Sequence, residues 1–117
     1  MEVGEVLARL KFLVNHDRFY MVQRQNRMAM PVSVTLAKEI VRQLSINDFV
    51  KHEPNRNNPL QFVWVFKTSD GQTYYIKFVF TENNQKVVFI SFCILQNRST
   101  QLCNIIIHSC VMKKAIV

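Results

Sequence analysis

The chain has 117 residues, enough for one domain with a single hydrophobic core. Hydrophobic residues make up 49% of it and include nine Phe, three Tyr and one Trp, so its composition excludes a wholly disordered protein. Fifteen Lys and Arg against eight Asp and Glu give a formal net charge of +7. This charge suits a polyanionic partner, nucleic acid first and an acidic protein second, and it equally suits plain solubility.

Two amphipathic helices are predicted in the N-terminal part of the chain. Apolar residues recur at helical spacing over residues 2–15, and the same spacing recurs over about residues 34–44. Between them, residues 18–23 are rich in strand-forming side chains and are expected to be extended.

The segment after the second helix carries a helix start signal followed by turn-forming residues. Ser45 and Asp48 fit a capping box, which predicts a short third helix over residues 46–51. The polar sequence HEPNRNNP at 52–59 is predicted to be a loop.

The next forty residues are predicted to form an antiparallel meander. Residues 61–67 and 73–80 alternate between two faces, and the Asp70-Gly71 pair between them is a strong hairpin signal. After a turn at 82–85, residues 86–94 are apolar on both faces, as expected for a central strand.

The predicted fold class is therefore α+β, an antiparallel sheet of three or more strands with the N-terminal helices packed on one face. Residues 1–94 are expected to form one domain, and residues 95–117 a C-terminal extension to which the pattern assigns no structure.

The cysteines and the apolar segments indicate the compartment. Cys93, Cys103 and Cys110 are widely spaced and form no zinc-binding pattern, so we expect free thiols in a reducing environment. No apolar run is long enough to span a membrane, and the charged residues of the first helix exclude a signal-peptide core. A cytoplasmic protein without membrane contact is expected.

The candidate catalytic residues are lysines, tyrosines and histidines. The chain has no nucleotide-binding glycine motif, no nucleophile elbow and no metal-spaced acid cluster, so we expect neither a cofactor nor a metal. Tyr75 and Lys77 leave the same face of their strand, and Lys51 and His52 end the predicted short helix. Such residues can cleave a phosphodiester without metal, although a Tyr and a Lys on a solvated sheet face are more often ordinary surface residues.

Five segments, taken in order, resemble the MqsR (motility quorum-sensing regulator) toxins, the ribonuclease component of type II toxin–antitoxin pairs. They are ARLKFLVN at 8–15, INDFVK at 46–51, VWVFK at 63–67, GQTYYIKF at 71–78 and VVFISF at 87–92. The resemblance covers about residues 6–93. It implies a fold akin to RelE-type and other small microbial ribonucleases, and metal-independent endoribonucleolytic cleavage of single-stranded mRNA. It also implies a cognate antitoxin as partner; a homo-oligomer is compatible with the sequence as well.

The resemblance also implies site residues. Lys51 and Tyr75 fall on the lysine of the D-F-x-K string and on the tyrosine before the strand lysine. We add His52 and Gln61 as further catalytic candidates. The residues expected to bind RNA are Lys77, Arg56, Lys67, Arg24 and Arg27.

Two positions depart from the family pattern and support an alternative function. Val63 stands where the family often has Gln, with Gln61 two residues away, and Cys93 stands where a basic residue often follows S-F. The alternative is a non-catalytic RNA- or protein-binding module on the same fold, with a degenerate active site. A weaker alternative is a small phage or host-interaction protein whose likeness to the family is accidental.

Overall fold

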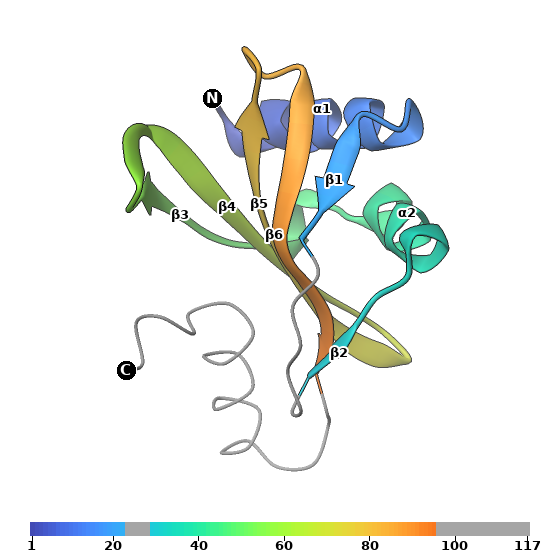
Figure 1. Cartoon of the computed structure of the whole chain (residues 1–117). Coiled ribbons are helices and arrows are strands. Elements are labelled where there is room, and N and C mark those ends of the chain that lie inside the picture. Colours follow the sequence, from blue (N-terminus) through green and yellow to red (C-terminus); the bar gives the residue numbers. More distant parts are fainter. Residues whose placement is uncertain (23–28, 96–117) are drawn as a thin grey trace.

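The structure, a computed structural model, describes residues 1–22 and 29–95, and these form a layer of helices on one face of a sheet (Figure 1). Helix α1 (Val3–Asn15) and helix α2 (Val34–Gln43) lie where the apolar spacing predicted them. The predictions for Arg24, Arg27 and residues 96–117 fall outside the described residues.

Each helix begins at a cap supplied by the sequence. At α1 the cap is a capping box, in which the side chain of Glu5 accepts a hydrogen bond from the backbone N–H of Glu2. At α2 the Ser33 hydroxyl accepts from the Leu36 N–H at 3.2 Å. Both helices bury the apolar stripe that the spacing indicated.

Within the described residues, the sheet has six strands and is mostly antiparallel. The strands are β1 (Phe19–Met21), β2 (Ala29–Pro31), β3 (Phe49–Asn55), β4 (Asn58–Asp70), β5 (Gln72–Thr81) and β6 (Lys86–Leu95). Their order is β1-β6-β5-β4-β3, and β2 pairs with β6 off this path. Only the β1–β6 pairing is parallel among the strand pairs described. The predicted α+β class and the meander, now β4-β5-β6, are confirmed.

The two turns of the meander use left-handed backbone. Gly71, between β4 and β5, has φ +76°, which favours glycine, so the predicted hairpin is confirmed. Glu82, Asn83 and Asn84, between β5 and β6, all have φ between 53° and 64°, and the Gln85 N–H closes the turn on the Thr81 carbonyl at 3.0 Å. Asn tolerates this region better than Glu does.

The segment around Lys51 and His52 differs from the prediction. The expected helix over 46–51 is only a 3-10 turn, η1 (Ile46–Asp48), and β3 follows at once, so the expected loop over 52–59 is wrong. A polar segment containing Pro54 can be a strand here because, among the described strands, β3 lies at the sheet edge and pairs only with β4. Lys51 and His52 therefore have strand geometry and point to opposite faces.

The sheet buries apolar side chains on both faces. One cluster joins the helices to the side chains of Phe66, Ile76, Phe78 and Phe89, all at most 1% exposed. The other lies on the opposite face and consists of Val63, Val65, Tyr75, Val79, Cys93 and Leu95, with Val88 and Ile90 packed against it. A bulge makes this second cluster possible: Lys77 pairs with Ser91 and Phe78 with Phe89, so Ile90 is an extra residue in β6.

The structure bears on two of the expectations about compartment, the absence of a membrane span and the free cysteine thiols. Within residues 1–22 and 29–95, no helix is long and apolar enough to cross a membrane. Cys93 is disulfide-bonded, so the expectation of a free thiol is wrong at this position. The other two cysteines lie outside the described residues.

Candidate functional site

The polar residues singled out in the sequence gather mainly on one side of the sheet. We call this side the second face: it is turned away from α1 and α2 and carries Lys51, Glu53, Lys67, Tyr75 and Lys77. Lys51 lies opposite Val65, and Val65 lies opposite Lys77, so the two lysines share a row across three strands. One step along β4, Lys67 lies opposite Tyr75. The face therefore joins a tyrosine to three cations and one carboxylate.

Lys51 forms an ion pair that the sequence did not predict. Its Nζ lies 3.6 Å from Oε1 of Glu53, two residues along β3 on the same face. The side chains are 42% and 35% exposed, so a ligand can reach both. Glu53 was missed because residues 52–59 were interpreted as a loop; the alternating burial of β3 is the signal that places it beside Lys51.

Tyr75 has a buried ring and an accessible hydroxyl. The residue is only 4% exposed, because the second cluster packs around it; the sequence had placed it on a solvated face. No hydrogen bond joins its hydroxyl to another described residue. No buried side-chain oxygen or nitrogen lacks a partner in the described parts of the chain, so the hydroxyl oxygen keeps at least a small exposed area. Packing thus holds in place a donor that is available to a ligand.

The electrostatic surroundings keep this hydroxyl protonated. Burial, first, and the negative charge of Glu53, second, raise the pKa of Tyr75 above its ordinary value of 10.0. At neutral pH Tyr75 is therefore a neutral phenol that can donate a hydrogen bond, and it is not a base.

His52 lies on the other side of β3 and is not brought together with Lys51 and Tyr75. Its ring is near three aromatic rings, with centroid distances of 4.9 Å to Trp64, 5.2 Å to Phe62 and 6.2 Å to Phe49. Phe62 is 44% exposed, so this aromatic cluster is partly open to solvent.

Gln61 is held by hydrogen bonds at both ends of its amide. Asn55 Nδ2 donates to Gln61 Oε1 at 2.7 Å, and Gln61 Nε2 donates to the Phe80 carbonyl at 2.8 Å. These bonds tie β4 to β3 and to β5 beyond the last β4–β5 pair, Trp64–Phe78. Beside Gln61 lies a polar groove of about 440 Å³ that reaches the turn at residues 82–84.

The residues expected to bind RNA are only partly gathered. Lys67 and Lys77 lie on the second face; Lys67 is exposed, and Lys77 is half-buried and has an interaction partner. Arg56 is exposed in the turn between β3 and β4. In the described ranges, no group of three or more His, Cys, Asp or Glu is placed to hold a metal ion.

Comparison with known proteins connects this arrangement to a family. No curated protein is found to match the chain. Over residues 5–93, from α1 into β6, the sequence matches the family described as motility quorum-sensing regulator, toxin of MqsA. This span contains Lys51, Glu53, Tyr75 and the rest of the second face. As the resemblance predicted, the chain belongs to the MqsR family of toxins.

Proposed function

We propose that this toxin is an endoribonuclease that cleaves single-stranded mRNA in the cytoplasm and is restrained by a cognate antitoxin. The observation that supports this most is the grouping of the Lys51–Glu53 pair with the accessible Tyr75 hydroxyl on one cationic face. These three groups supply a carboxylate, an ammonium and a neutral hydrogen-bond donor, which together suffice for phosphodiester cleavage by the neighbouring ribose hydroxyl.

Each residue has a defined part in this reaction. Glu53 takes the proton from the ribose 2′-hydroxyl as its oxygen attacks phosphorus. Lys51 and the Tyr75 hydroxyl bind the phosphoryl oxygens, on which negative charge develops. The P–O5′ bond then breaks, and the leaving 5′ oxygen takes a proton from the Lys51 ammonium. Glu53, 3.6 Å away, returns its proton to Lys51, so both residues regain their starting states.

The surroundings of this group suit a single-stranded polyanion. Lys67 and Lys77 extend the positive charge of the face past Tyr75, and attraction to backbone phosphates should weaken steeply with salt.

The test is RNA cleavage by purified protein in EDTA, comparing the parent with Lys51→Ala and Glu53→Gln. Loss of a general base or of a charge-stabilising cation should slow cleavage by about 10²–10⁴-fold. Arg9→Ala is the matched control, because it also removes one positive charge but lies on α1. A parent that leaves RNA intact contradicts the activity; Lys51 and Glu53 variants that cleave normally contradict the site.

A non-catalytic RNA- or protein-binding module is the second candidate function. It is favoured by the two positions that depart from the family pattern, since Val63 and Cys93 are both 4% exposed within the second cluster and present no polar group there. This function predicts that RNA is retained by the parent protein with no cleavage product at any protein concentration.

A further inference from the structure

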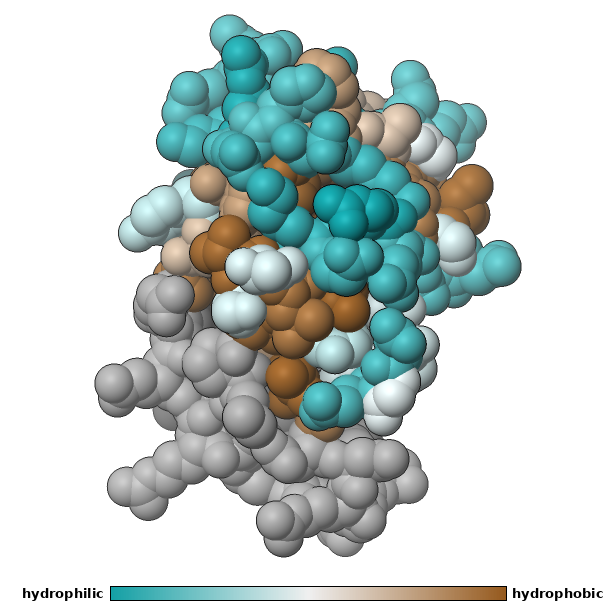
Figure 2. Space-filling model, turned by 90° about the vertical axis from the view of Figure 1, so that its right-hand side faces the viewer, coloured by the Kyte–Doolittle hydropathy of each residue, from teal (hydrophilic) through white to brown (hydrophobic). Residues whose placement is uncertain are grey.

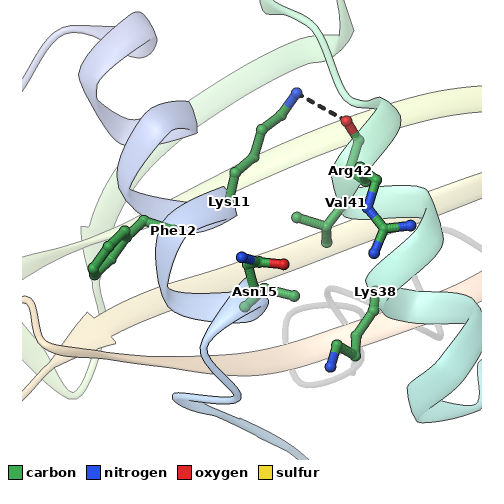
Figure 3. A pocket seen from close by; sticks show the side chains of 7 residues that line it. Lys11, Phe12, Asn15, Lys38, Val41 and Arg42 are labelled. Carbon is green, nitrogen blue, oxygen red and sulfur yellow. Dashed lines mark hydrogen bonds between the residues drawn. The ribbon is translucent and has the colours of Figure 1, made fainter.

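A basic pocket lies between the two helices, in the layer opposite the second face. Its volume is about 290 Å³, and it is lined by Lys11, Phe12 and Asn15 of α1, by Lys38 and Arg42 of α2, and by one valine from each helix (Figure 3). The proposed ribonuclease reaction uses none of these residues. Figure 2 shows the side of the molecule that carries α2 and the end of α1. Its upper part is mainly hydrophilic, and hydrophobic residues lie below.

Three cations from two helices line this pocket. Lys11 Nζ donates to the Arg42 carbonyl at 3.0 Å, which fixes the ammonium at the end of α2 and leaves its other N–H groups to bind a ligand. Figure 3 shows Lys11 on one wall, and Arg42 and Lys38 on the other.

Two carboxylates neutralise part of this charge from outside the lining. Lys38 Nζ lies 2.6 Å from Asp17 Oδ1, and the Arg42 guanidinium lies 2.8 Å from Glu39 Oε1. The Asp17 and Glu39 side chains are 73% and 51% exposed, and such exposed ion pairs contribute little stability. A dianion in the pocket can therefore draw both cations away from their carboxylates at small cost.

The remaining lining consists of Asn15 and three apolar side chains. The Phe12 side chain is unusually open for an aromatic residue, at 53% exposed, and its ring lies 4.2 Å from that of His16. Figure 3 shows the Phe12 ring pointing away from Lys38 and Arg42, so the three cations are the groups of this pocket that can bind a phosphate. The volume lies near the lower end of the range for small-molecule sites, enough for a phosphate and its sugar.

We propose that this pocket binds the phosphate group of a nucleotide, with Lys11, Lys38 and Arg42 on the phosphate. The phosphate can belong to a free nucleotide or to an RNA chain. The proposal goes beyond the ribonuclease function and stands without it, because the pocket and the second face lie on opposite sides of the sheet.

Calorimetric titration of the parent protein with adenosine monophosphate, adenosine and inorganic phosphate tests the proposal. Charge-assisted hydrogen bonds to phosphate should make adenosine monophosphate bind at least about tenfold more tightly than adenosine. The double variant Lys11→Gln/Arg42→Gln should lose at least that factor. The control Arg9→Gln/Lys86→Gln removes the same charge at two residues that do not line the pocket, and it should bind like the parent. If the double variant does not fold, Lys38→Gln provides the same comparison.

A short 2′-O-methyl oligonucleotide, which the proposed reaction cannot cleave, distinguishes the two sources of phosphate. Tighter binding than the mononucleotide, weakened by Lys11→Gln/Arg42→Gln, supports an RNA chain; weaker binding supports a free nucleotide. The proposal is overturned if adenosine binds as well as its monophosphate, or if the helix variants bind like the parent. None of these results depends on whether the protein cleaves RNA.

Discussion

Replacing Tyr75 with Phe should separate the activity of this protein from its stability. The ring stays in the second cluster, and the lost hydroxyl has no hydrogen-bond partner among the described residues, so the free energy of unfolding should change by less than about 0.5 kcal/mol. In the proposed transition state, the same hydroxyl is one of the donors to the phosphoryl oxygens. Loss of one such preorganised donor costs about 2.7–4 kcal/mol, so cleavage should slow by about 10²–10³-fold.

The measurement has two parts. Single-turnover cleavage of a labelled RNA in EDTA gives the chemical rate, and urea unfolding followed by circular dichroism gives the stability. Tyr75→Ala serves as the contrasting variant, because removing the buried ring should destabilise the fold by about 3–5 kcal/mol.

Two results would refute the reasoning. If Tyr75→Phe cleaves RNA at the parent rate, the hydroxyl does not contact the reacting phosphate. If Tyr75→Phe unfolds as readily as Tyr75→Ala, the hydroxyl holds the fold together and its proposed availability to a ligand is wrong.

Three further predictions concern the fold. Phe78→Ala removes a fully buried ring that meets Phe66, Phe80 and Phe89, and should lower the free energy of unfolding by about 3–5 kcal/mol in urea titration. The Cβ that Gly71→Ala adds has no atom within 4 Å, so the variant should lose about 1–2 kcal/mol of stability through its left-handed backbone alone. Gly71→Asn should lose less, and equal melting temperatures for the two variants would contradict this. The raised pKa of Tyr75 means that, above its ordinary value of 10.0, the unfolded chain binds fewer protons than the folded chain, so stability falls as pH rises further. Urea midpoints of the parent should therefore fall more steeply than those of Tyr75→Phe between about pH 9 and 11.

The sequence predicts which face of the meander each side chain takes, because apolar and polar residues alternate along its strands. The sequence placed Tyr75 and Lys77 together and Ile76 and Phe78 opposite, and the register of β4, β5 and β6 confirms it. The burial of Tyr75 could not be predicted in the same way. It depends on a bulge at Ile90 that turns residues on either side of it in β6 towards the same face.

The candidate site was predicted incompletely because the segment that forms β3 was interpreted as a loop. The sequence HEPNRNNP has the composition of a loop, and strand propensity gives no hint that an edge position will accept Pro54. Because β3 was not predicted, neither the pairing of Lys51 with Glu53 nor the separation of His52 from Lys51 could be inferred. The parallel pairing of β1 with β6 is likewise a tertiary contact that short-range pattern does not encode.

The position of β6 in the sheet has a consequence for how this toxin is synthesised. β6 pairs with β1, β2 and β5, yet it is the last strand described along the chain. At about 5–20 residues per second, translation takes roughly 4–15 s to proceed from the end of β1 to the end of β6. During that interval α1 and β1 lack the strand on which they pack, and the second cluster lacks Cys93 and Leu95. The nascent chain therefore cannot complete the packing around Tyr75 until β6, the last strand described, has been made, so the proposed cleavage activity should begin only after that point in synthesis.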